Sequence, residues 1–404
     1  MYKSIYQKFS FFQLLLALLI LTGIVSGCKK EPGLNADNEQ LQSEDNNSKD
    51  VSLKSFIQVN LVANNANYNA ATIDPTLKNG WGIAWSPGGT AWVNSQGGHV
   101  SELYNGQGIK AALTVNIPSP GGSEGGNPTG IIFNPNVADF VIPSGNTTPA
   151  TRALFIFVGV DGIVSGWNPS WVNHAFAKFN NVATSAYTGL AIAKNGGSNF
   201  LYAADFRAGK IAVWDRTWAP VAMAFTDPNL PAGYSPFNIQ EVNGQLFVMY
   251  AKVASDGRSQ AGKGLGIVDI FTPSGDFVKR FANKDKLNAP WGVTMAAASF
   301  FPQKIEDDEE KDDDNSNHTP QPKILVGNFG DGKINIYSMT GKFLGQLKSH
   351  DHVISIDKLW AIGFAPTTSS IDQNRLYFAA GPNNEEDGLF GYLIKDNSIK
   401  IDHD

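Results

Sequence analysis

The chain has 404 residues, of which 42% are hydrophobic, with a formal net charge of -6 and a pI of about 5.6. A mildly acidic sequence without a basic block argues against a nucleic-acid partner. The length exceeds that of a small single-core domain, and the single cysteine excludes an internal disulfide, so stability must come from a large core.

The first 27 residues have the pattern of a secretory signal peptide. Lys3 and Lys8 precede an apolar run over residues 11–21, which is short for a membrane span. Residues 25–28 read Val-Ser-Gly-Cys, and this segment resembles the lipobox of bacterial lipoproteins. We therefore expect cleavage before Cys28 and acylation of its thiol, for example by palmitate. The alternative is an ordinary N-terminal anchor with an incidental cysteine.

This signal predicts an exported protein that is held by lipid on Cys28 to a bacterial membrane, with the outer membrane, facing the periplasm or the surface, as the expected location. Residues 28–55 are mostly polar and predict a disordered tether. We expect the folded domain over residues 56–398 and a short tail over 399–404.

Six segments of the domain begin alike, which indicates an internal repeat. They start at residues 80, 128, 187, 235, 290 and 359, and four of them carry Gly before an aliphatic residue (Gly82, Gly130, Gly189 and Gly292). Each is followed by short apolar runs that are separated by Gly, Asn, Asp or Pro, as in antiparallel strands. The pattern predicts an all-β fold: a six-bladed β-propeller of four-stranded antiparallel blades. A pair of β-sandwiches is the rival architecture, but it would not explain six similar openings.

Three further segments carry predictions about the ring. Residues 56–62 alternate like a strand, and we expect them to complete the last blade and close the ring. An acidic run within about 303–321 predicts a disordered insertion, with a metal loop as the alternative. The Gly-, Pro- and Ser-rich residues 116–128 predict a long mobile connection between the first two units.

Two runs carry a resemblance to a known group of proteins. They are Asn-Ala-Pro-Trp-Gly-Val at 288–293 and Leu-Val-Gly-Asn-Phe-Gly-Asp-Gly-Lys-Ile-Asn at 325–335. Both are similar to an uncharacterised family of exported bacterial β-propellers that resemble NHL-type six-bladed propellers. The resemblance covers roughly residues 58–395 and implies a fold but no established activity, so no catalytic residue is carried over from it.

Some six-bladed propellers bind one cation on the axis through Asn, Asp and Glu side chains that follow the second strands. The corresponding positions here suggest Asn94, Asp205 and Asn328 as ligands of one Ca²⁺. Asp161, Arg207 and Asn383 are expected to border a ligand on the same face. The alternative is that these residues stabilise turns, as Asn and Asp often do.

The sequence is compatible with two functions. The first is a binding or scaffold module at the cell envelope, which presents its loops to an unknown protein, glycan or small ligand. The second is a metal-dependent hydrolase or lyase with an axial cation. No arrangement of a nucleophile with an activating base is recognisable, so the first function is favoured.

Overall fold

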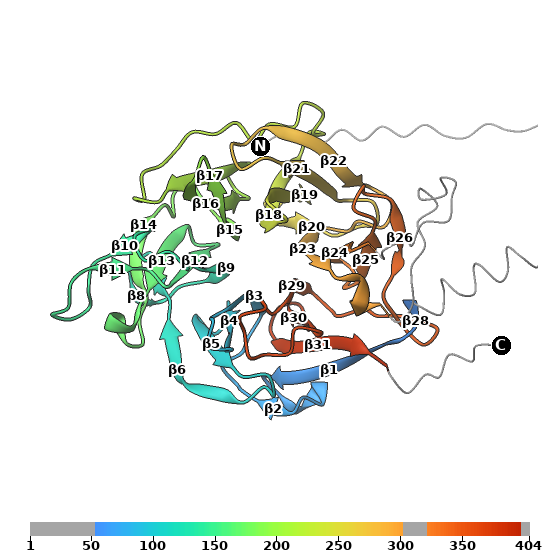
Figure 1. Ribbon diagram of the computed structural model, residues 1–404, viewed down its shortest axis with the longest axis horizontal. Coiled ribbons are helices and arrows are strands. Elements are labelled where there is room, and N and C mark those ends of the chain that lie inside the picture. The colour runs from blue at the N-terminus through green and yellow to red at the C-terminus, as the bar shows by residue number, and fades with distance from the viewer. Residues whose placement is uncertain (1–52, 302–320, 397–404) are drawn as a thin grey trace, which may run out of the picture. The chain divides into compact units, whose positions relative to one another are not determined.

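The computed structural model describes residues 53–301 and 321–396, which form a six-bladed β-propeller of antiparallel sheets (Figure 1). In every blade, the innermost strand contacts the innermost strand of the next blade. The inner strands are β3 (Gly80–Trp85), β9 (Pro128–Phe133), β15 (Tyr187–Asn195), β18 (Tyr234–Val242), β23 (Pro290–Ala296) and β29 (Leu359–Phe364). They coincide with the six repeat openings, so the predicted fold class is confirmed.

The remaining strands follow outward in sequence order, except that the outer strand of the last blade comes from the start of the domain. The second strands are β4 (Ala91–Ser95), β12 (Phe155–Gly159), β16 (Ser198–Asp205), β19 (Gln245–Val253), β24 (Lys323–Asn328) and β30 (Leu376–Ala380). The third strands are β5 (Val100–Tyr104), β13 (Ile163–Trp167), β17 (Lys210–Asp215), β21 (Ile267–Phe271), β25 (Ile334–Tyr337) and β31 (Leu389–Lys395). The fourth strands are β6 (Lys110–Asn116), β14 (Phe176–Asn180), β22 (Phe277–Asn283), β26 (Phe343–Gln346) and β1 (Phe56–Ala63). The short elements are β2 (Thr72–Ile73), β7 (Pro118–Ser119), β8 (Gly122–Gly125), β10 (Val141–Ile142), β11 (Thr151–Arg152), β20 (Ser259–Gln260), β27 (Lys348–Ser349), β28 (His352–Val353) and the 3-10 helices η1 (Ala66–Tyr68), η2 (Pro169–Trp171) and η3 (Ala298–Phe300).

The third blade departs from the predicted four strands, because its sheet contains only β15, β16 and β17. The chain after β17 runs beside it for a short distance, with a bridge between Trp214 and Pro220 and a bond from the N–H of Val221 to the carbonyl of Val213 at 2.9 Å. Proline has no N–H for a strand ladder, so the regular pairing ends there.

The ring is closed by the N-terminal strand, as the sequence predicted. Strand β1 pairs antiparallel with β31, and the two lie side by side in blue and red (Figure 1). Val62 of β1 is fully buried opposite Phe390. The last blade is therefore built from both ends of the domain, which leaves no open edge at the junction.

The inner strands are crowded at the repeated glycines. A Cβ atom on Gly82 would lie 2.4 Å from the carbonyl oxygen of Thr129 in the next blade, and one on Gly292 would lie 2.8 Å from the carbonyl oxygen of Trp360. The pairing of β3 with β4 shifts register between Gly80 and Ile83, and similar irregularities recur in the other blades. The repeated small residue is thus explained by contact between blades.

The connection over residues 116–128, which its composition predicts to be long and mobile, contains a short hairpin. This hairpin is formed by β7 and β8, and the side chain of Glu124 lies 3.0 Å from His174 Nε2. Asn180 also donates to the carbonyl of Pro120 at 3.0 Å. Polar contacts to the second blade therefore give this Gly- and Pro-rich segment a defined path.

The predicted boundaries fall partly outside the described ranges. The signal peptide, Cys28, most of the proposed tether, the acidic run at 306–314 and the tail at 399–404 all lie outside residues 53–301 and 321–396. Leu53, which the sequence placed in the tether, is buried against the fifth and sixth blades, because it is apolar and packs in their core. Over the described residues, no helix has the length and apolarity needed to cross a membrane.

Candidate functional site

The axis of the propeller is filled by aromatic side chains. At the register shift of three inner strands stand Trp81, Trp291 and Trp360, each no more than 5% exposed. The cluster, which we call the axial aromatic cluster, consists of Trp81, Phe206, Phe237, Trp291, Phe329 and Trp360. All six inner strands line an axial cavity of about 40 Å³. This volume has room for a few water molecules, and not for an organic ligand.

The predicted cation ligands are not equivalent in the structure. Strand pairing places Ser95, Asp205 and Asn328 opposite the first residue of their inner strands. Asn94 comes one residue earlier, so the pleat turns its side chain to the other face of the sheet. There its Nδ2 donates to the carbonyl of Thr129 at 3.0 Å. The alignment of Asn94 with Asp205 and Asn328 was therefore wrong by one residue, because turn residues alone do not define strand register.

The three equivalent side chains stabilise the backbone that precedes each inner strand. The Oγ of Ser95 accepts from the N–H of Lys78 at 2.8 Å, and Asp205 Oδ1 accepts from that of Ala186 at 3.0 Å. Asn328 Oδ1 accepts in the same way from the N–H of Asn288 at 3.1 Å. Each side chain therefore bonds within its own blade. The three oxygens point to different backbone segments and do not converge.

The other predicted ligand-face residues are also held by local bonds. Asp161 Oδ2 accepts from the N–H of Asn127 at 2.8 Å, and Arg207 donates to the carbonyl of Val182 at 2.8 Å. The N–H of Asn383 donates to Asp357 at 3.1 Å. The structure does not bring these residues together into one constellation. Across residues 53–301 and 321–396, no three His, Cys, Asp or Glu side chains gather as a metal site requires.

A convergent polar site that the sequence does not predict lies on the face where the inner strands begin. Asn79 directly precedes β3 and is buried, and its Nδ2 donates to Glu385 Oε1 at 3.3 Å and to Gln96 Oε1 at 3.0 Å. Its Oδ1 accepts from the indole N–H of Trp360 at 2.9 Å. Asn79 therefore connects the axial aromatic cluster with a carboxylate of the last blade.

Glu385 stands in a strained turn between β30 and β31. Asn383, Asn384 and Glu385 have φ values of 55°, 55° and 71°, which non-glycine residues rarely adopt in succession. The turn is held by Asp387, which accepts from Asn64 at 2.7 Å and from the hydroxyl of Tyr68 at 2.6 Å. Left-handed residues that are held so firmly are typical of functional sites.

Two cations are near enough to the Glu385 carboxylate to influence its pKa. Burial raises the pKa of Glu385, while Arg258, the hydrogen bond from Asn79 and Lys358 oppose that rise. The ammonium of Lys358 lies 4.6 Å from the ring centre of Phe329. Neither cation forms an ion pair with any of the residues described here. We call Asn79, Arg258, Lys358 and Glu385 the axial polar site; it combines residues of blades one, four and six.

A sequence signal for this site did exist. The run at 382–387 reads Pro-Asn-Asn-Glu-Glu-Asp, and Asn in succession tolerates left-handed backbone. Nothing in the sequence places Arg258 in the neighbourhood of Glu385, because the two residues are far apart in the chain and only the closed ring brings them within electrostatic range.

Comparison with known proteins identifies relatives but no activity. No protein-family model matches the chain. Uncharacterised protein R648 of Acanthamoeba polyphaga mimivirus is 30% identical over 359 residues, which cover 85% of this chain and 81% of the relative. Uncharacterised protein L690 of the same virus is 30% identical over 354 residues, which cover 85% of this chain and 87% of the relative.

Two solved structures with a similar backbone are enzymes by their names. A virginiamycin B lyase from Staphylococcus aureus has a TM-score of 0.44 and 13% identity, covering 84% of this chain and 98% of the lyase. The soluble aldose sugar dehydrogenase from Escherichia coli has a TM-score of 0.47 and 12% identity, covering 84% of this chain and all (100%) of the dehydrogenase. On the sequence relationship, the chain belongs to the family of uncharacterised proteins that includes mimivirus R648 and L690.

Proposed function

We propose that the protein is a lipid-anchored binding module at a bacterial cell envelope, and that it binds a small ligand at the axial polar site. One observation carries the proposal: polar side chains from three blades, Asn79, Arg258 and Lys358, act on the half-buried carboxylate of Glu385. Placing an acid in a strained turn beside an aromatic cluster is costly for stability, and functional sites are where such costs are usually found.

The charges of the site suggest the chemistry of the ligand. The guanidinium of Arg258 and the ammonium of Lys358 can both bind an anionic group of a ligand. Glu385 can accept hydrogen bonds from hydroxyl groups of the same ligand. A small polyhydroxylated anion satisfies both requirements.

The aromatic filling of the axis favours binding over axial chemistry. Phe329 lies under the ammonium of Lys358, Trp360 donates to Asn79, and the two ring centres are 4.1 Å apart, so aromatic rings pack directly beside the polar site. The ligand would therefore rest on the face of the propeller, where it is also open to a partner protein.

A panel of small anions tests this function. D-gluconate, glucose 6-phosphate and glycerol 3-phosphate are compared with uncharged glucose in thermal unfolding of the purified protein. An anion that binds the folded state should raise the melting temperature, because binding stabilises by mass action. Arg258→Met and Glu385→Gln should remove that rise, whereas Lys178→Met on the outer strand β14 should keep it. If no anion moves the transition, or if both site variants respond like the wild type, the axial polar site is not the binding site.

One buried carboxylate oxygen, Asp205 Oδ2, favours a second function, namely an enzyme with an axial cation. Asp205 Oδ2 is buried and has no hydrogen-bond partner among the residues described. A carboxylate oxygen left in this state is a good ligand for Ca²⁺. The contacts of Asn94 and Asn328 give Asp205 no shared site with them, so other ligands would have to come from backbone carbonyls or water.

A further inference from the structure

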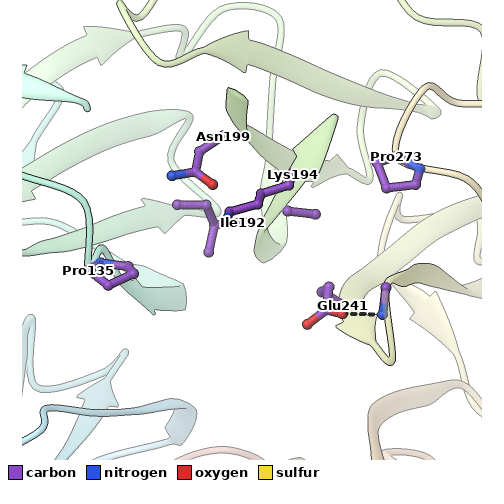
Figure 2. Close-up of a pocket in the computed structure, with 8 residues that line it drawn as sticks. Pro135, Ile192, Lys194, Asn199, Glu241 and Pro273 are labelled. Atoms are coloured by element: carbon purple, nitrogen blue, oxygen red, sulfur yellow. Dashed lines mark hydrogen bonds between the residues drawn. The ribbon is translucent and has the colours of Figure 1, made fainter. Parts of the chain in front are cut away.

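A second cavity, of about 320 Å³, is lined by residues of blades two, three and four (Figure 2). Its walls come from β15, from the hairpin that joins β18 and β19, and from Pro135 and Pro273 on either side. Lys194 and Glu241 stand near the ends of their inner strands, whereas Asn79 directly precedes one. The cavity therefore lies at the opposite end of the strands from the axial polar site.

The walls of the cavity are fixed by bonds behind them. Tyr202 donates its hydroxyl to the carbonyl of Pro273 at 2.7 Å, and Arg152 donates to the carbonyl of Pro135. Asn199 donates to Asp139 Oδ2 at 2.7 Å and is the cross-strand partner of Lys194. These bonds hold the walls in one arrangement, and the volume lies at the lower end of the range found for small-ligand sites.

The lining combines an apolar surface with two opposite charges. Ile192, Ala193 and the two prolines supply apolar contact, while Lys194 and Glu241 are both exposed at the border. Glu241 uses Oε1 to accept the N–H of Gly244 at 2.6 Å, drawn as a dashed line in Figure 2, which holds the carboxylate in place. Within residues 53–301 and 321–396, neither charge forms an ion pair.

We propose that this cavity binds a short apolar peptide with free termini, of about the size of a dipeptide. The peptide carboxylate would face Lys194, its ammonium group would face Glu241, and its aliphatic side chains would cover Ile192 and the prolines. Each charge of the cavity then meets its opposite, and apolar area is removed from water on both partners. The site is independent of the axial polar site and of its ligand.

Isothermal titration of the purified protein with L-leucyl-L-leucine tests the proposal. Because exposed ion pairs contribute up to about 1 kcal/mol each, Lys194→Met and Glu241→Gln should each weaken binding about threefold to fivefold. The double variant should lose about the product of the two factors. Exposed Lys210→Met on β17 is the matched control and should bind like the wild type.

A capped peptide separates the proposal from simple apolar contact. N-acetyl-leucyl-leucinamide has the same side chains and no charge, so it should bind at least about tenfold more weakly. Equal binding of the capped and free peptides would show that the charges play no part and would overturn the assignment. Absence of heat and of thermal stabilisation with the free peptide would overturn it as well.

Discussion

The indole rings of Trp81 and Trp360 stack with their centres 3.5 Å apart and their planes inclined by 15°. Trp81 belongs to the first blade and Trp360 to the last, so the stack lies where the ring closes. Trp360 also contacts Phe237, Trp291 and Phe329, and thereby joins the cluster across the axis.

Replacing Trp360 should therefore destabilise the whole propeller. Trp360→Ala removes a fully buried indole and its bond to Asn79, and we expect a loss of about 3–5 kcal/mol in the free energy of unfolding. Urea unfolding followed by circular dichroism measures it. Ile109→Ala, at a side chain that is 62% exposed, should change stability by less than about 0.5 kcal/mol. A loss below 1 kcal/mol for Trp360→Ala would mean that the axial cluster is not part of the stabilising core.

Closure by β1 is tested with one buried charge. Val62→Asp places an unpaired carboxylate in the core of the last blade, and we expect a loss on the order of 4 kcal/mol or more. Gln58→Glu changes an exposed position of the same strand and should be nearly neutral. Equal unfolding midpoints for the two variants would argue that β1 does not contribute to the closed ring.

Asp269 predicts a specific pH dependence of stability. Burial raises the pKa of Asp269 to about 7 from an ordinary value of 3.8, although Arg280 donates to it at 2.9 Å. The folded protein then binds more protons than the unfolded chain between these two values, so this group lowers stability progressively as pH rises from about 4 to about 7.

Asp269→Asn should remove this contribution. Between pH 5 and pH 8, the urea midpoint of the wild type should fall further than that of the variant. Asp276→Asn, at an exposed carboxylate of the same blade, should follow the wild type. If the wild type and Asp269→Asn lose stability in parallel, Asp269 is ionised in the folded protein at pH 5.

Calcium provides the test of the alternative function. If Asp205 helps to hold an axial cation, adding Ca²⁺ to chelator-treated protein should raise its melting temperature, and Asp205→Asn should abolish that rise. Mg²⁺, Mn²⁺ and Zn²⁺ are measured in parallel. A transition that none of these ions moves would remove the metalloenzyme from consideration.

Anchoring through Cys28 is tested in cells. Cys28→Ser should abolish incorporation of labelled palmitate and leave the precursor uncut or release a soluble form, because the thiol is the site of acylation in a lipoprotein. Cell fractionation and gel mobility record both effects. Undiminished palmitate labelling of the variant would contradict the lipoprotein prediction.

The sequence alone determined the architecture. Six similar openings, each followed by short apolar runs and turn residues, were sufficient for the number of blades and for the closing role of β1, because these features repeat locally along the chain. Its local signals did not reveal the missing fourth strand of the third blade, where Pro220 interrupts the pairing.

Only the tertiary structure decided which side chains meet. A shift of one residue in a strand turns a side chain to the other face, and for that reason Asn94 could not be told from Ser95 by spacing. Arg258 and Glu385 come together because the ring brings distant turns to one axis, and Lys194 and Glu241 share a cavity because two blades lie next to each other. Such contacts depend on closure and packing of the whole domain, which no local pattern encodes.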